Sequence, residues 1–121
     1  MSYDDNNIFA KILRGEIPSK KIYEDEYVLS FYDVNPQKKI HALIIPKGKY
    51  IDLDDFNAKA SDKEIVGLLK GISIAAKKLG ISLDMGKGYR TLSNLSEDGG
   101  QEVPHLHFHL FGGERIGKMV Q

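Results

Sequence analysis

The sequence predicts a single α+β domain in which a mostly antiparallel sheet of about five strands is accompanied by one long and one short helix. Short segments of alternating or β-branched residues recur along the 121-residue chain, each bounded by turn-forming residues. Two other segments, one long and one short, have apolar residues at helical spacing. Short strands mixed with a few helices in this way are typical of α+β domains.

The short helix is predicted near the N-terminus. Asn6 or Asn7 can cap its start, and Gly15 can end it. Its apolar residues at helical spacing are Ile8, Phe9, Ile12 and Leu13.

Three strands are predicted next, at residues 21–24, 27–33 and 41–45. Alternation along a strand assigns side chains to faces. The residues expected to share a face are Leu29, Phe31 and Asp33 in the second strand, and His41, Leu43 and Ile45 in the third.

Residues 49–60 are acidic and irregular, which favours a solvent-exposed loop. Asp52, Asp54 and Asp55 resemble a calcium-binding loop only weakly, because the glycine and terminal glutamate of such a loop are absent at the required offsets.

The long helix begins at a capping box, Ser61-Asp-Lys-Glu64, and ends at Gly80. Val66 and Ile74 widen its apolar stripe, so it is either a well-buried helix or one that also contacts a second subunit. The stripe itself consists of Ile65, Leu68, Leu69, Ile72, Ala76 and Leu79.

A fourth strand is expected at residues 89–94. A polar, glycine-containing loop at 96–101 then leads into the segment 103–110, which alternates three histidines with apolar residues. Residues 112–121 show no clear pattern.

Composition excludes several classes of function. Seventeen basic residues balance seventeen acidic ones, so no positive excess is available to bind nucleic acid or an anionic membrane. The absence of cysteine excludes disulfide and thiolate chemistry. No apolar run approaches the ~20 residues that span a bilayer, and the polar, acidic start lacks the features of a signal peptide. We therefore expect a cytoplasmic protein.

The alternation in 103–110 predicts a half-buried strand with His105, His107 and His109 on one face. Imidazole titrates nearest to neutral pH, so such a row indicates an active-site face. A solvent-exposed strand that is rich in histidine by chance is the simplest alternative, but the strict spacing disfavours it.

A metal site is a second alternative. His105 and His109 would lie ~13 Å apart at the backbone, too far for all three histidines to bind one zinc ion. Two neighbours could bind zinc together with His41 or a carboxylate, which leaves one histidine unexplained. We expect neither a metal nor another cofactor.

Covalent catalysis by histidine explains more of the sequence. A neutral imidazole nitrogen attacks phosphorus readily, and flanking histidines can orient it and protonate a leaving group. Gly99 and Gly100 allow backbone N–H groups to approach an anion. A module that binds nucleotides without turning them over remains an alternative, because the same pocket would serve both purposes.

Residues 105–111, His-Leu-His-Phe-His-Leu-Phe, resemble the signature of the histidine-triad (HIT) superfamily, in which His-x-His-x-His is followed by two hydrophobic residues. Further segments are similar to its Hint branch in order and spacing, namely 8–18, 31–33, 36–37, 41–47, 87–90 and 98–101. They cover most of residues 7–113, and the resemblance implies that residues 1–121 form a single HIT domain.

The resemblance implies hydrolysis of purine nucleoside 5′-phosphoramidates, such as adenosine monophosphoramidate, by a homodimer whose two sheets join into one. Dinucleoside polyphosphate hydrolysis, as in the related Fhit branch, is the alternative activity. The resemblance further implies that His107 attacks the α-phosphorus and that His109 lies beside the phosphate and leaving group. His105 and His41 would form a proton relay behind His107.

Other positions that match the family are expected to contact the nucleotide along with His107 and His109. These are Asp33 at the ribose with Val34 beside it, Ile8, Phe9, Phe31 and Leu43 around the base, and Asn94, Gly100 and Gln101 on the phosphate side. Glu102 is expected to contact the nucleotide on the same side, although its residue type differs from the family pattern.

Two positions depart from the pattern. Glu102 stands where many Hint proteins have a serine that donates to the phosphate, and its carboxylate would repel a phosphate unless turned away or protonated. Asn7-Ile-Phe-Ala10 stands where some relatives have a zinc-binding Cys-x-x-Cys, so we predict no structural zinc.

Overall fold

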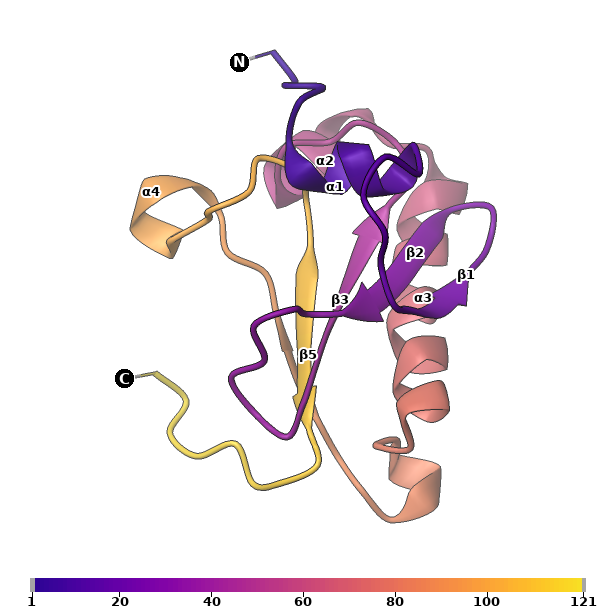
Figure 1. Cartoon of the computed structure of the whole chain (residues 1–121), viewed down its shortest axis with the longest axis vertical. Helices are drawn as coiled ribbons and strands as arrows, with labels where there is room; N and C mark the ends of the chain where they lie inside the picture. Colours follow the sequence, from indigo (N-terminus) through magenta and orange to yellow (C-terminus); the bar gives the residue numbers. More distant parts are fainter. Residues whose placement is uncertain (1, 121) are drawn as a thin grey trace.

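The computed structural model describes residues 2–120; Met1 and Gln121, which the sequence analysis included in the domain, lie outside the described residues. Its centre is an antiparallel sheet with the strand order β1-β2-β3-β5-β4 (Figure 1). The strands are β1 (Lys21–Glu24), β2 (Val28–Tyr32), β3 (Ile40–Pro46), β4 (Arg90–Leu92) and β5 (Phe108–Gly112). The helices are α1 (Ile8–Leu13), α2 (Leu53–Lys59), α3 (Asp62–Leu79) and α4 (Ser96–Gly99), with a 3-10 turn at Leu83–Met85. The predicted α+β class and five-stranded sheet are confirmed.

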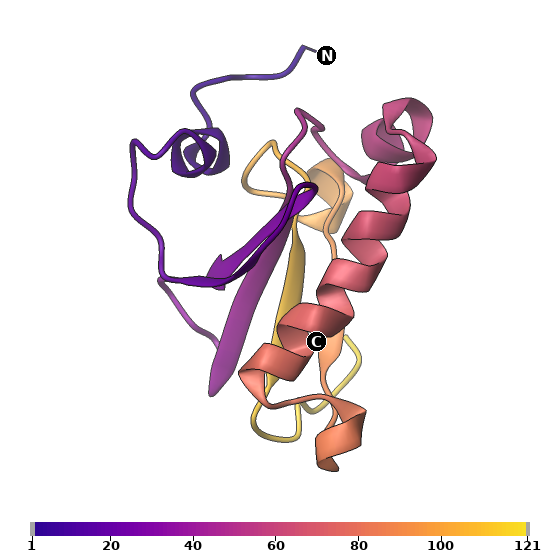
Figure 2. The same ribbon diagram turned by 90° about the vertical axis from the view of Figure 1, so that its right-hand side faces the viewer.

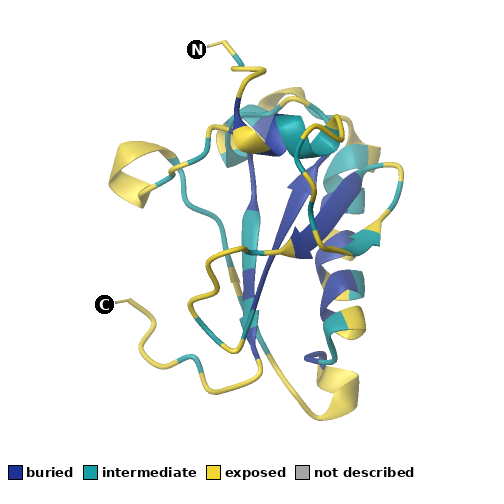
Figure 3. Cartoon of the chain, viewed as in Figure 1, coloured by how far each residue is buried: buried dark blue, intermediate teal, exposed yellow. Residues whose placement is uncertain are grey.

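The two faces of the sheet are covered by different helices, with α1 on one side and α3 on the other (Figure 2). Alternate residues of β2 and β3 therefore pack into two apolar clusters, and both strands are buried (Figure 3). The cluster under α3 includes Val28, Ala42, Ile44, Leu68, Ile72 and Ala75. The cluster under α1 includes Phe9, Leu29, Phe31, Leu43 and Ile45, which confirms the predicted face of each strand.

The long helix has the predicted ends. The side chain of Ser61 accepts a hydrogen bond from the backbone N–H of Glu64, and the Glu64 carboxylate accepts one from the backbone N–H of Ser61. Gly80 caps the C-terminus. At Gly71 a β-carbon would lie 3.0 Å from Val28, so glycine allows α3 to approach the sheet closely. The predicted stripe was wrong at Leu69, which is 60% exposed on the outer side of the helix.

The prediction of an irregular loop at 49–60 was wrong, because residues 53–59 form α2. Asp52 caps this helix by accepting a hydrogen bond from the backbone N–H of Asp55 at 2.8 Å. Acidic residues in a first turn also interact favourably with the helix dipole. Only Phe56 is buried, so the segment has no apolar periodicity that would indicate a helix.

The histidine segment differs from the predicted strand at 103–110, because β5 begins at Phe108 and the first two histidines precede it. Continuing the β3–β5 register would place Pro46 opposite Leu106. Proline has no N–H to donate to a ladder, and the Pro46 carbonyl instead accepts a hydrogen bond from Nε2 of His105 at 2.9 Å. The alternation is still retained, since Leu106 is buried in the core under α3.

The remaining segments are shorter than predicted or more ordered. The strand expected at 89–94 is limited to Arg90–Leu92. The expected loop at 96–101 begins with the single turn of α4, which Gly100 ends in the left-handed region at φ 76°. Within residues 2–120, no helix has the length and apolar character needed to cross a membrane.

Candidate active site

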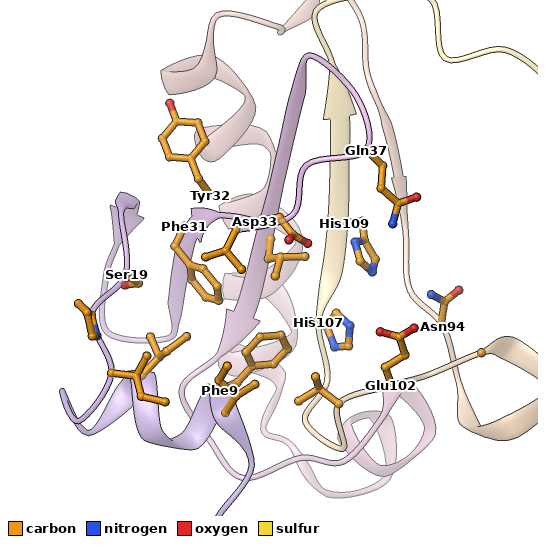
Figure 4. A pocket seen from close by; sticks show the side chains of 18 residues that line it. Phe9, Ser19, Phe31, Tyr32, Asp33, Gln37, Asn94, Glu102, His107 and His109 are labelled. Atoms are coloured by element: carbon orange, nitrogen blue, oxygen red, sulfur yellow. The ribbon is translucent and has the colours of Figure 1, made fainter.

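A pocket of about 300 Å³ lies on the sheet face that carries α1 (Figure 4). This volume falls at the lower end of the range of small-molecule sites. Every residue expected to contact a nucleotide lines the pocket except Gln101. Those that line it are Ile8, Phe9, Phe31, Asp33, Val34, Leu43, Asn94, Gly100, Glu102, His107 and His109.

The pocket has an apolar end and a polar end. Phe9 and Phe31 lie toward the first, with ring centroids 5.7 Å apart in an edge-on arrangement. His107 and Glu102 lie toward the second, and Asp33 projects between the two (Figure 4). The pocket therefore matches a ligand with an apolar ring at one end and polar groups at the other.

His107 has its nitrogens in distinct roles. Its Nδ1 lies 2.8 Å from the backbone carbonyl oxygen of His105, so Nδ1 carries the proton and donates to that carbonyl. Nε2 of the neutral ring then has a free lone pair. Burial lowers the pKa of His107, although the hydrogen bond to the His105 carbonyl and the negative charges of Asp33 and Glu102 oppose this shift. The ring is therefore neutral, and nucleophilic at Nε2, at neutral pH.

His109 is oriented by His41 from the neighbouring strand. The backbone N–H of Gln37 donates to Nδ1 of His41 at 3.1 Å, so a neutral His41 carries its proton on Nε2. That Nε2 lies 2.9 Å from Nδ1 of His109 and donates to it. A neutral His109 consequently carries its own proton on Nε2.

The Asp33 carboxylate completes this group, with its Oδ2 3.3 Å from Nε2 of His41. Burial lowers the pKa of His41, while the negative charge of Asp33 acts in the opposite direction. Burial and the neighbouring imidazoles lower the pKa of His109 to about 4, again opposed by Asp33. Without a ligand, these two rings are neutral at pH 7.

The expected relay of His105 and His41 behind His107 has a different geometry. The side chain of His41 contacts His109, and His105 contacts His107 through its backbone carbonyl. The fully buried His105 ring donates from Nε2 to the Pro46 carbonyl and accepts at Nδ1 a hydrogen bond from the Tyr3 hydroxyl. Its ring therefore fixes the position of the segment that carries the His107 acceptor.

Tyr3 is a contact that sequence reasoning missed. It belongs to a polar N-terminal segment in which no periodicity indicates contact with the histidines 102 positions away. An ion pair between Lys49 and Asp5 (2.8 Å) also holds this segment in place. Other missed residues line the pocket from three parts of the chain: α1 and the segment before β1 (Ile12, Ile17, Pro18, Ser19), the end of β2 and the loop after it (Tyr32, Gln37), and the loop between α4 and β5 (Val103). For the segment between α1 and β1, the sequence did contain a signal. The pair Ile17-Pro18 is apolar, and a solvent-exposed turn does not need two apolar residues.

Gln101 was expected to contact the ligand from the phosphate-side loop, but it does not line the pocket. The Gln101 side chain donates to the carbonyls of Ile51 (2.6 Å) and Val103 (3.0 Å), so it fastens the loop. The backbone N–H groups of Gly100 and Gln101 donate back to carbonyls of α4. Among the described hydrogen bonds, the backbone N–H groups of Glu102 and Val103 have no acceptor, so both are available to an anion at this edge of the pocket.

One set of side chains has the composition of a metal site. Ligand atoms of Asp33, His41 and His109 all lie within 4.8 Å of one another. Two of the nitrogens are joined by the 2.9 Å hydrogen bond described above, and a metal would have to replace its proton. The donor set fits zinc by type, but binding would break the arrangement that orients His109.

Comparison with known proteins places this site in a family. The model of the HIT domain family matches residues 14–116. An "uncharacterized 13.2 kDa HIT-like protein" of Azospirillum brasilense is 53% identical over 119 residues, which are 98% of this chain and 95% of that protein. An "uncharacterized HIT-like protein" of Helicobacter pylori is 45% identical over 109 residues, 90% of this chain and 98% of the other.

Solved structures agree with the sequence comparisons. A HIT family hydrolase from Clostridium thermocellum has a TM-score of 0.86 at 36% identity, covering 98% of this chain and 99% of that one. A histidine triad protein from Clostridium difficile has a TM-score of 0.80 at 40% identity, covering 98% of each chain. With the family model matching residues 14–116 and two of the three alternating histidines, His107 and His109, lining one pocket, the chain belongs to the HIT family.

Proposed function

We propose that this protein hydrolyses purine nucleoside 5′-phosphoramidates to a nucleoside monophosphate and an amine, through a covalent intermediate on His107. The observation that carries the proposal is the bond from Nδ1 of His107 to the His105 carbonyl, which leaves Nε2 of a neutral ring free at the pocket. The structural likeness to a HIT family hydrolase supports a hydrolytic reaction.

In the first step, Nε2 of His107 attacks the α-phosphorus and the P–N bond breaks. The departing amine needs a proton, which His109 supplies from Nε2. An anionic phosphoryl group beside His109 raises its pKa by favouring the imidazolium, so the His109–His41 pair takes up the proton when substrate binds. The products of this step are a nucleotidyl-His107 and a neutral amine.

In the second step, water attacks the phosphorus of the nucleotidyl-His107. His109, now neutral, accepts a proton from this water as general base. The bond between phosphorus and Nε2 of His107 breaks, and the ring returns to its neutral state with Nδ1 still bound to the His105 carbonyl. The nucleoside monophosphate leaves, and His109 then releases the extra proton and returns to its neutral resting state.

Substrate binding divides between the two ends of the pocket. The rings of Phe9 and Phe31 provide apolar contact for a purine, and the Asp33 carboxylate can accept hydrogen bonds from ribose hydroxyls. The N–H of Glu102 and the side chain of Asn94, both on pocket-lining residues, are the donors proposed for the phosphoryl oxygens. Preorganised donors of this kind stabilise charge that develops in a transition state.

Mass spectrometry after mixing the protein with adenosine 5′-phosphoramidate tests the mechanism. We expect a transient mass increase of one adenylyl group on the wild type and none on His107→Ala. Full turnover by the wild type without any adduct under rapid acid quench would contradict the covalent route.

Two alternatives remain distinguishable with the same protein. Faster cleavage of a dinucleoside polyphosphate than of the phosphoramidate would favour the polyphosphate hydrolase. Nucleotide binding with no turnover of either substrate would favour a binding module.

The proposed form of the protein is a cytoplasmic homodimer whose sheets join. Two features support the dimer: β4 is the last strand of the sheet, and α3 exposes the apolar side chains of Val66 (47%) and Leu69 (60%). An unpaired sheet edge and exposed apolar side chains both favour association. A measured mass of one chain in dilute solution would contradict the proposed dimer. Fractionation of cells tests the cytoplasmic location.

A further inference from the structure

The pocket has an unusual charge for one proposed to bind a phosphate ester. Within the described residues, no lysine or arginine lines it, whereas two carboxylates do, those of Asp33 and Glu102. Charged ligands therefore meet a negative field, set by these two carboxylates.

The carboxylates occupy different parts of the pocket. Asp33 lies between the apolar and polar ends, where the ribose is proposed to bind, while Glu102 lies beside His107 and Asn94 at the polar end (Figure 4). With the purine among the phenylalanine rings and the phosphorus at His107, the leaving group lies at the polar end of the pocket, which both Glu102 and His109 line.

Glu102 also combines two opposite properties. Its backbone N–H has no acceptor among the described hydrogen bonds, so the residue can bind a phosphoryl oxygen through its main chain. Its side chain is exposed, and no ion pair within residues 2–120 neutralises it. The main chain can therefore bind the phosphate, while the carboxylate attracts or repels the charge of the leaving group attached to the phosphorus.

We infer that Glu102 determines which leaving group the enzyme accepts, favouring amines that carry a further positive charge and disfavouring those that carry a carboxylate or phosphate. This inference rests on the proposed function and names the substrate class within it. It also predicts that polyphosphate leaving groups, with several negative charges, are poor substrates.

Coulomb's law gives the size of the effect. A unit charge ~6 Å from a carboxylate at an effective dielectric constant between ~20 and ~80 changes binding about 3-fold to 100-fold. Because Glu102 is exposed, we expect the lower part of this range, about tenfold between a cationic and an anionic leaving group. Salt screens exposed charges, so this ratio should fall as ionic strength rises.

Three adenosine phosphoramidates of matched length test the inference, with 1,2-diaminoethane, propylamine and β-alanine as leaving amines. At pH 7 these leaving groups carry a positive charge, no charge and a negative charge. We expect kcat/KM of the wild type to decrease in that order. In Glu102→Gln the ratio between the cationic and anionic substrates should fall by about tenfold, whatever the intrinsic reactivity of each substrate.

Glu97→Gln is the matched control, because Glu97 lies outside this pocket in the same loop region and the charge change is identical. It should leave the ratio unchanged. If all three substrates react but Glu102→Gln keeps the wild-type ratio, the role of Glu102 is wrong and the proposed function stands. If none of the three reacts, the proposed function itself fails.

Discussion

The imidazoles of His41 and His109 are joined by a hydrogen bond of 2.9 Å, in which Nε2 of His41 donates to Nδ1 of His109. The direction of this bond follows from the backbone N–H of Gln37, which occupies the other nitrogen of His41. A ring held in this way presents a protonated Nε2, and that is the atom a departing amine requires. His107 is held in the opposite tautomer by the His105 carbonyl. Two adjacent histidines thereby act as nucleophile and acid without a charge on either resting ring.

Substitution of His109 should affect substrates according to their leaving groups. With an amine leaving group, His109→Ala should lose about 10²- to 10⁴-fold in kcat, because general acid catalysis is absent. With 4-nitrophenolate, which leaves without a proton, the loss should be much smaller. Steady-state kinetics with adenosine phosphoramidate and adenosine 4-nitrophenyl phosphate provide the comparison. His107→Ala is the control that should lose both activities, and equal losses for both substrates in His109→Ala would remove its role as acid.

The hydroxyl of Tyr3 should contribute to both stability and activity. Tyr3→Phe keeps the edge-on ring contact with His105 but leaves the buried Nδ1 of that histidine without a donor. An unsatisfied buried group costs about 1–3 kcal/mol, which chemical denaturation can measure. Activity should decrease as well, since His105 holds the carbonyl that accepts from His107. The hydroxyl of Tyr89 has no hydrogen bond among the described residues, so the control substitution Tyr89→Phe should change neither stability nor activity. A Tyr3→Phe protein of unchanged stability would contradict the role of the Tyr3 hydroxyl.

The sequence predicts the part of the site that depends on alternation along strands. Phe31 could be placed with Leu29, Leu43 with Ile45, and the three alternating histidines with one another, because successive strand residues face opposite ways. The capping box and Gly80 likewise located both ends of α3, since each makes a local hydrogen-bonding pattern. These predictions needed only neighbours in sequence.

The missed features depend on contacts between distant segments. Tyr3 meets His105 only after the N-terminal segment folds across the end of the sheet, and nothing in its local sequence specifies this. The start of β5 at Phe108, rather than earlier, depends on Pro46 in the neighbouring strand, which the register would place opposite Leu106. Gln101 was expected at the phosphate because of its position, whereas its amide is used by carbonyls of two other segments. Such contacts follow from tertiary structure and leave no periodic signal.

Zinc ions should inhibit the enzyme, and chelators should not. The proposed steps use only protein side chains, so activity should persist in EDTA. Added Zn²⁺ should bind among Asp33, His41 and His109 and remove the lone pairs and proton that orient His109. Initial rates at increasing free Zn²⁺ measure this, with Mg²⁺ as the control because it prefers oxygen ligands. Loss of activity in EDTA that zinc restores would instead support a metal-dependent reaction.

The buried ring of His105 should make the protein less stable in mild acid. Burial lowers its pKa to about 4, partly offset by the Pro46 carbonyl, and the charge of a protonated His107 lowers it further. In the unfolded chain the same ring binds a proton below about 6.5. Between these values the unfolded state binds more protons than the native state, so stability decreases as the pH falls from about 6.5 to 4. For one group with this shift, the full loss is about 3 kcal/mol.

His105→Gln isolates this contribution, because glutamine does not titrate and its amide can still donate to the Pro46 carbonyl. The variant should be less stable than the wild type at pH 7.5. The difference should then shrink as the pH approaches 4, since only the wild type bears the cost of keeping this ring neutral. Urea denaturation of both proteins at several pH values measures the difference, and the other histidines and the carboxylates, common to both, largely cancel. A constant difference between pH 7.5 and 4 would mean that the His105 ring titrates alike in the folded and unfolded chains.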